Sequence, residues 1–122
     1  VRPVVVVVAL GDEVGLRGQS PAAMRTNLET IIARLTASGS RVLLAGMRMP
    51  PNYGAEYTRE FAGVFPDVAR RTHVALMPFL LEGVAADPRF LQADGLHPNA
   101  AGHQIIADRL WPYLLPLLQR AR

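Results

Sequence analysis

An aspartate and a histidine three residues apart are the side chains of this sequence best suited to chemistry. Asp94 and His97 stand in the stretch Asp94-Gly95-Leu96-His97-Pro98, whose glycine and proline indicate a loop. A carboxylate beside an imidazole fixes the ring's tautomer and stabilises the imidazolium that forms when the ring takes a proton from a nucleophile. The spacing is therefore compatible with an Asp–His pair for general base catalysis. The competing interpretation is a plain loop in which Asp94 caps a turn.

No serine or cysteine occupies a position in the sequence at which His97 would obviously take its proton. The chain has no cysteine, which excludes a thiolate nucleophile, a disulfide and a thiolate metal site. Ser20 precedes Pro21 at the start of a helical pattern, so we interpret Ser20 as a helix N-cap rather than a nucleophile. His103 follows His97 by six residues instead of the three or four expected of helical metal ligands. We predict neither a metal nor a cofactor.

Length, composition and charge narrow the class of protein. The 122 residues suffice for one domain with a real core, and 50% of them are hydrophobic. The net charge is +3, and the 13 basic residues are all arginines, mostly scattered among acidic ones. This pattern favours a solvated basic surface over a nucleic-acid site. No apolar run reaches the length of a membrane span. The apolar run at the start of the sequence is too short, and too rich in β-branched residues, for a signal peptide.

The elements that must position the pair alternate between strands and helices. Val4–Leu10 and Arg41–Met47 are continuous apolar runs, typical of parallel strands buried on both faces, and residues 74–79 predict a third, short strand. Helical spacing predicts one helix from Pro21 to a cap at Gly39, a second from about Ala55 and a last one from about Asn99. This βαβαβα order predicts a single α/β domain over residues 1–122, a three-layer α/β/α sandwich with a parallel sheet.

Local signals add three further expectations. Pro66 should kink or split the second helix, and Pro112 and Pro116 should break the last one into shorter turns, because proline lacks an amide proton and clashes with the preceding turn. Leu80–Ala86 should form a short helix. The glycine-rich residues 11–18 follow the first strand, at the edge of the sheet where ligands bind in such folds.

Four segments together resemble the SGNH (GDSL-type) hydrolases, in the branch of thioesterase I, lysophospholipase and arylesterase. They are Leu10-Gly11 with Gly15-Leu16-Arg17-Gly18, then Arg48 to Gly54, Leu76-Met77-Pro78-Phe79, and Asp94 to Asn99. They follow the family's order and spacing over nearly the whole chain, which corresponds to the C-terminal two thirds of such a domain. The resemblance implies a truncated, flavodoxin-like fold lacking the first two strands. It also implies hydrolysis of acyl esters or thioesters by a serine nucleophile, without a cofactor.

The resemblance further implies roles for single residues. His97 corresponds to the general base and Asp94 to its orienting partner. Asn52 and Tyr53 belong to a substrate-binding loop, and the alternative for Tyr53 is that it shapes this loop without binding substrate. Gly11 and Glu13 stand at oxyanion positions, and Glu13 replaces an asparagine whose amide would donate to the oxyanion. A carboxylate has no proton to donate, and its charge opposes the oxyanion. Loss of one such donor costs about 3 kcal/mol in hydrolases.

The family's nucleophile block has no counterpart in this sequence. A second alignment places residues 10–14 on that block with Glu13 in place of the serine, but the following Gly-Leu-Arg-Gly favours the first alignment, and neither restores a nucleophile. We therefore expect a chain that is inactive or impaired when alone.

The alternative to a hydrolase is a non-catalytic remnant or assembly module. Without the family's first two strands, Val4–Leu10 becomes an exposed edge that can pair with another chain. The expected partner is a second copy, in a homo-oligomer or a strand-swapped dimer, or a separate N-terminal fragment. Members of the resembled branch are often periplasmic or secreted, and the residues themselves leave the compartment unknown.

Overall fold

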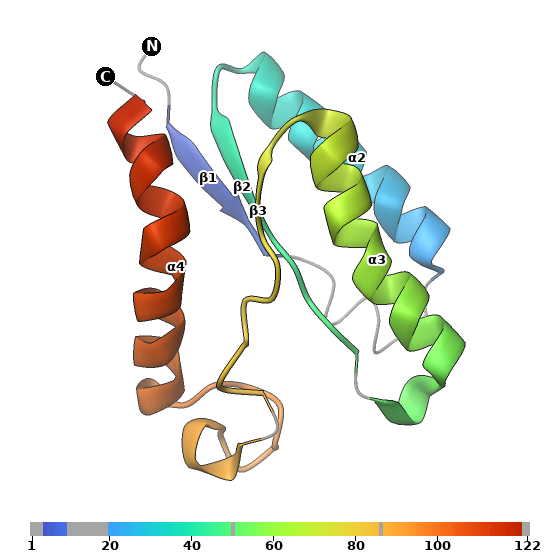
Figure 1. Cartoon of the computed structure of the whole chain (residues 1–122), viewed down its shortest axis with the longest axis vertical. Helices are drawn as coiled ribbons and strands as arrows, with labels where there is room; N and C mark the ends of the chain where they lie inside the picture. The colour runs from blue at the N-terminus through green and yellow to red at the C-terminus, as the bar shows by residue number, and fades with distance from the viewer. Residues whose placement is uncertain (1–3, 10–19, 50, 86, 121–122) are drawn as a thin grey trace.

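The chain forms a three-layer α/β/α sandwich. The structure, a computed structural model, describes residues 4–9, 20–49, 51–85 and 87–120. Three parallel strands form one sheet in the order β1-β2-β3, namely β1 (Val5–Val8), β2 (Arg41–Ala45) and β3 (Ala75–Met77). Figure 1 shows α2 (Pro21–Ala37) and α3 (Ala55–Thr72) on one face of the sheet and α4 (Ala100–Arg120) on the other. The predicted fold class is confirmed.

The α2/α3 layer is held to the sheet by a continuous apolar core. Leu28 and Ile32 of α2 are each only 1% exposed, as are Phe61 and Phe65 of α3. The two phenylalanine rings meet edge to face with their centroids 5.7 Å apart, an arrangement that aromatic pairs prefer. Full burial of each such side chain stabilises the fold by about 1.5–3 kcal/mol. The helical spacing of apolar residues seen in the sequence therefore marks the true inner face of these helices.

Helix α2 begins and ends where its sequence signals predict. The Ser20 hydroxyl accepts a hydrogen bond from the Ala23 amide at 3.1 Å, and Pro21 occupies the first helical position. Beyond the last turn, Gly39 has a φ of +90°, a left-handed conformation that glycine adopts without a steric penalty. Ser20 therefore has the capping role expected of it.

No proline divides its helix, so the expected split of α3 and the expected breaks of α4 were wrong. Helix α3 runs unbroken through Pro66, and α4 runs unbroken through Pro112 and Pro116. The sequence gives each helix a strong packing face that outweighs the lost hydrogen bonds. In α4 that face meets the sheet through a stripe of three leucines on α4 and two residues on β2 and β3: Leu110, Leu114, Leu117, Leu43 and Met77.

The exposed side of α4 explains why its two prolines are tolerated. Pro112 and Pro116 are both exposed, so their rings do not disturb the leucine stripe. The carbonyl groups that lose an amide donor belong to Asp108 and Pro112, which are exposed as well. Water can bond these carbonyl oxygens, which lowers the cost of the missing intrahelical bonds.

The expected short helix at Leu80–Ala86 was also wrong, because residues 80–85 form hydrogen-bonded turns. The Leu80 amide donates to the carbonyl of Gly46 at 2.9 Å, which ties the segment to the end of β2. Gly83 has a φ of +82°, a left-handed conformation that ends a right-handed helix.

Strand β1 is an edge of the sheet, as expected. Among the described strands it pairs with β2 alone, in the register Val5–Arg41 to Val8–Leu44. Its valines are therefore less buried than those of a strand with neighbours on both sides. Residues 5–7 are half-buried, and of the four strand residues only Val8 is fully buried. The predicted strand extended to Leu10, which lies outside the described residues.

Candidate active site

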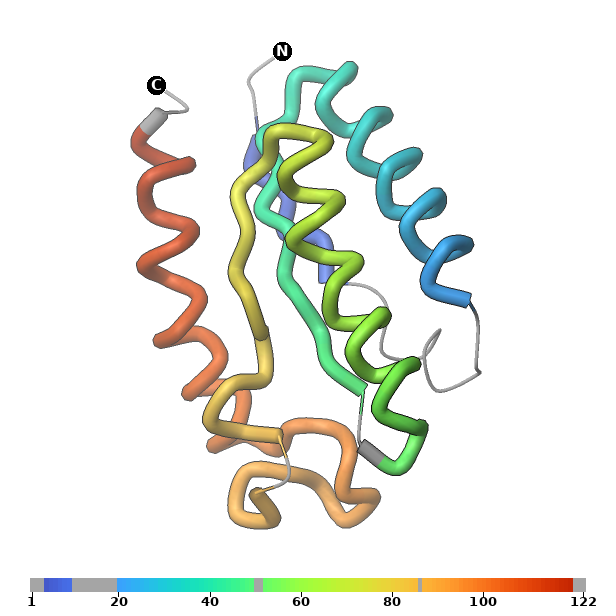
Figure 2. Tube along the Cα trace, turned by 45° about the vertical axis from the view of Figure 1, so that its right-hand side comes forward, coloured from blue at the N-terminus to red at the C-terminus, as the bar shows by residue number. Residues whose placement is uncertain are grey.

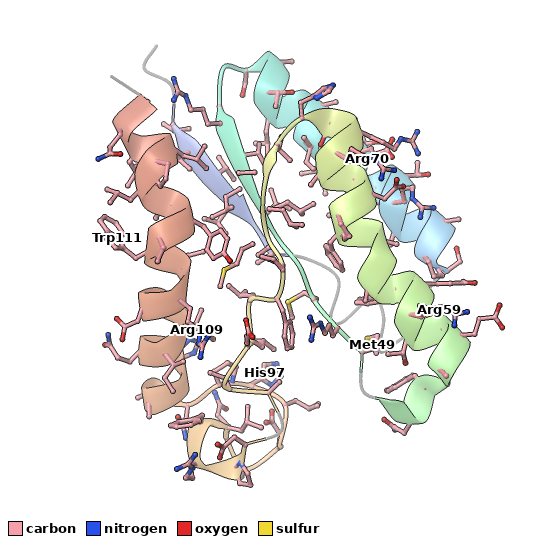
Figure 3. The ribbon with its side chains drawn as sticks, in the orientation of Figure 1. Met49, Arg59, Arg70, His97, Arg109 and Trp111 are labelled. Atoms are coloured by element: carbon pink, nitrogen blue, oxygen red, sulfur yellow. The ribbon has the colours of Figure 1, made fainter. Side chains whose placement is uncertain are left out.

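Asp94 and His97 lie in the loop between the short 3-10 helix η2 (Pro88–Phe90) and α4. Figure 3 shows His97 at the end of the molecule toward which the strands point. Nδ1 of His97 lies 2.5 Å from Oδ2 of Asp94, and an ionised carboxylate only accepts, so Nδ1 carries the proton. The other oxygen, Oδ1, accepts from the amides of Leu96 at 2.9 Å and His97 at 3.0 Å. One oxygen thus holds the turn while the other holds the ring.

The hydrogen bonds to the carboxyl group of Asp94 stabilise its ionised form. The side-chain hydrogen bond from His97 lowers the pKa of Asp94 most, followed by the bonds from the Leu96 and His97 amides, to about 2 from an ordinary 3.8. Asp94 is therefore a carboxylate at neutral pH. The side chains of His97 and Asp94 are 60% and 42% exposed, so reactants in solution can approach the pair.

A short antiparallel pairing fixes the backbone on both sides of His97. Leu91 and Pro98 form an antiparallel bridge. The Gln92 amide donates to the His97 carbonyl at 2.7 Å, and the Asn99 amide donates to the Phe90 carbonyl at 2.9 Å. His97 therefore sits on a hydrogen-bonded platform formed by residues 89–92.

Asn99 joins this platform to the start of α4. Its Nδ2 donates to the carbonyls of Arg89 at 3.0 Å and Leu91 at 3.2 Å, and its Oδ1 accepts from the Gly102 amide at 2.9 Å. The sequence indicated only that the last helix begins near Asn99. The sequence could have indicated the capping role of Asn99, because asparagine is a favoured N-cap residue. It could not have indicated the bonds to residues 89 and 91, because these depend on the tertiary fold.

The other predicted site residues are distributed differently. Asn52 and Tyr53 lie on the 3-10 helix η1 (Pro51–Tyr53), which follows β2, and both side chains are exposed. Figure 2 shows the segment after β2 and the loop before α4 at the same end of the molecule, on separate elements. Gly11 and Glu13 lie outside the described residues.

The remaining serines and histidines have other surroundings. The Ser38 hydroxyl donates to the Leu35 carbonyl at 2.7 Å, and Ser40 precedes β2, so both lie at the amino end of the sheet, away from His97. His73 caps the end of α3 in a left-handed conformation. Within the described part of the chain, no three His, Cys, Asp or Glu side chains gather as metal ligands. No helix in that part is long and apolar enough to cross a membrane.

Comparison with known proteins gives consistent matches. Residues 1–105 match the GDSL-like Lipase/Acylhydrolase family. Esterase TesA of Pseudomonas aeruginosa is 43% identical over 117 residues, which are 96% of this chain and 58% of the relative. The thioesterase 1/protease 1/lysophospholipase L1 of Escherichia coli K12 is 37% identical over 117 residues, 96% of this chain and 56% of the relative. The chain thus spans little more than half the length of these curated relatives.

Solved structures give the same result for the fold. A crystal structure of TesA matches with a TM-score of 0.88 and 42% identity, covering 93% of this chain and 63% of that one. The psychrotrophic esterase EstA from Pseudoalteromonas sp., in a structure inhibited by monoethylphosphonate, matches with a TM-score of 0.86 and 31% identity, covering 93% and 62%.

Proposed function

The chain belongs to the GDSL-like lipase/acylhydrolase family, and from this premise we propose that it supplies the base half of an acyl ester or acyl thioester hydrolase site. The observation that carries the proposal is the 2.5 Å contact between Nδ1 of His97 and Oδ2 of Asp94. The names of the relatives, esterase and thioesterase, support the substrate class.

In the proposed mechanism, Nε2 of His97 takes the proton of a nucleophilic hydroxyl as its oxygen attacks the acyl carbonyl. The Asp94 carboxylate accepts the Nδ1 proton, so the imidazolium that forms is oriented and stabilised. The imidazolium then protonates the leaving alcohol or thiol, and a water molecule, deprotonated by the same ring, releases the acyl group as a carboxylic acid. Asp94 and His97 need no metal for these steps.

We further propose that the nucleophile is not among the serines of this chain. Ser20 caps α2, and Ser38 and Ser40 lie at the amino end of the sheet. Glu13 at an oxyanion position would oppose the negative charge that develops on the substrate oxygen. The 122-residue chain alone is therefore expected to hydrolyse esters very slowly, if at all.

A chimera tests the proposal. The segment of Esterase TesA outside the matched region is fused to this chain, and hydrolysis of a short-chain p-nitrophenyl ester is compared with that of the chain alone. The chimera should hydrolyse the ester, and His97→Ala should lower kcat by about a thousandfold or more. His103→Ala, an exposed histidine on α4, is the matched control.

Three outcomes would count against the proposal. An active chimera that tolerates His97→Ala would remove His97 from the reaction. A folded chimera that stays inactive even with Glu13→Asn, which restores an amide donor at the oxyanion position, would show that the Asp94–His97 pair is not competent. Activity of the chain alone that disappears in His97→Ala would show that the nucleophile lies within these 122 residues.

A second candidate function is an assembly module that pairs through the exposed edge strand. Its supporting observation is that β1, within the described sheet, has β2 as its one neighbour. It predicts association of the isolated chain, which light scattering measures.

A further inference from the structure

The geometry points to Asn99 as a positioning residue for the Asp94–His97 pair. Asn99 fixes the platform of residues 89–92, and the platform fixes the backbone of His97 so that its ring faces Asp94. The inference rests on the proposed use of this pair in hydrolysis. Its test reads the geometry of the pair directly, so a failure of the hydrolase proposal and a failure of this one give different results.

The side chain of Asn99 does more than start a helix. An N-cap needs one acceptor, which Oδ1 supplies to the Gly102 amide at 2.9 Å. Nδ2 in addition donates both of its protons, one to the Arg89 carbonyl and one to the Leu91 carbonyl. These partners also fix the orientation of the amide, because two carbonyls face its nitrogen and an N–H faces its oxygen. Serine or aspartate at this position would keep the cap and lose the double donation.

The platform that Asn99 holds closes the turn containing Asp94 and His97. The Gln92 amide donates to the His97 carbonyl at 2.7 Å, and the Gly95 amide donates back to the Gln92 carbonyl at 3.0 Å. The Gln92 side chain also donates to the Pro98 carbonyl at 3.1 Å. The distance between the carboxylate and the ring therefore depends on the position of residues 89–92 beneath them.

Helix α4 gives Asn99 a rigid support. A Cβ atom added at Gly102 would lie 2.3 Å from the carbonyl oxygen of Phe90, so the first turn of α4 lies directly against the backbone of η2. Farther along, Leu117 of α4 is buried against the sheet. The contacts thus run without interruption from the sheet through α4 and Asn99 to residues 89–92 and the Asp94–His97 pair.

Asn99→Ser in the purified 122-residue chain separates capping from positioning. NMR follows two signals: the titration of the Asp94 carboxyl carbon and the ¹⁵N chemical shifts of the His97 ring, which report whether Nδ1 carries the proton. Asn99→Ser should keep the helical circular dichroism of the chain, raise the pKa of Asp94 from about 2 toward 3.8, and shift the His97 ring nitrogens away from the Nδ1-protonated tautomer that Asp94 holds. Asn27→Ser, on the exposed face of α2, is the matched control and should change neither signal.

A folded Asn99→Ser chain with an unchanged Asp94 titration and unchanged His97 ring-nitrogen shifts would overturn the inference. If Asn99→Ser does not fold, Asn99→Thr provides the same test, since threonine also caps helices and has only one hydroxyl proton. Unfolding of both variants would likewise overturn it, since Asn99 would then be required for the fold itself rather than for the position of His97.

Discussion

The Asp94 carboxyl group is exposed, yet three hydrogen bonds hold its pKa near 2. Because the folded-state pKa lies below the ordinary value of 3.8, the ionised pair adds stability above about pH 4 and loses it as the pH falls toward 2. We expect the difference in unfolding free energy between the native chain and Asp94→Asn to be nearly steady from pH 5 to 4, to fall as the pH is lowered toward 2, and to vanish below pH 2. Urea unfolding at each pH measures it, and a difference independent of pH would contradict the assignment.

The pairing of Asp94 with His97 could be predicted because it is local. Two residues lie between them, and Gly95, with a φ of +70°, makes the tight turn that the sequence indicates. The tie from Asn99 to Arg89 could not be predicted in this way. It joins residues ten apart across a 3-10 helix and a turn, and it exists only because α4 packs directly on η2.

At the scale of elements, the close approach of α4 and η2 makes a specific prediction. Gly102→Ala would place a methyl group 2.3 Å from the Phe90 carbonyl oxygen, and neither backbone can move freely. We expect it to destabilise the chain by about 1–3 kcal/mol in urea unfolding and to change the His97 ring-nitrogen shifts. Gly63→Ala on α3, whose methyl would meet nothing within 4 Å, should instead stabilise by about 0.5–1 kcal/mol. Equal effects of the two substitutions would contradict the packing described.

The prolines of α4 make a second prediction. Pro112→Ala restores an amide donor in a helix that is already continuous, so we expect stabilisation by about 1–2 kcal/mol, less than the full helix penalty of proline because proline also restricts the unfolded chain. Pro88→Ala is the control. Pro88 is the first residue of η2, where a backbone amide would have no intrahelical acceptor. Replacing Pro88 should therefore be neutral or destabilising. Urea unfolding of both variants distinguishes them, and no gain from Pro112→Ala would contradict this account.

The same elements show which sequence signals were reliable. Ser20 and Gly39 were correct guides because a cap is a contact within one turn of the helix. Pro66 and Pro112 were poor guides because packing against the sheet, which lies far away in the sequence, outweighs a local preference. Leu80–Ala86 was mistaken for a helix because its apolar residues fill space beside β2 instead of following a helical face.

At the scale of the whole molecule, the order of elements was sufficient to predict the three layers. Parallel neighbours joined by helices must place those helices on the faces of the sheet, and α4 closes the second face through Leu117. The half-burial of Val5–Val7 depends instead on the order of strands in the sheet, which the apolar run itself does not encode.

The edge strand β1 determines how this chain should behave in solution. Arg41 donates its amide to the Val4 carbonyl at 2.8 Å, and hydrogen bonding alternates along a strand. Val6 and Val8 therefore bond toward β2, while the amides of Val5 and Val7 point away from it. An edge of this kind pairs with another strand, so we expect the purified chain to gain mass with concentration in light scattering.

Proline substitutions on β1 test the direction of that pairing. Val7→Pro removes an amide that points away from β2, so it should keep the β1–β2 hydrogen bonds and weaken association at least about tenfold. Val6→Pro removes an amide of the β1–β2 ladder and should lower the stability of the fold itself. A chain that stays monomeric at every concentration would refute the prediction. So would a Val7→Pro variant that associates as strongly as the native chain, since the contact would then lie on another surface.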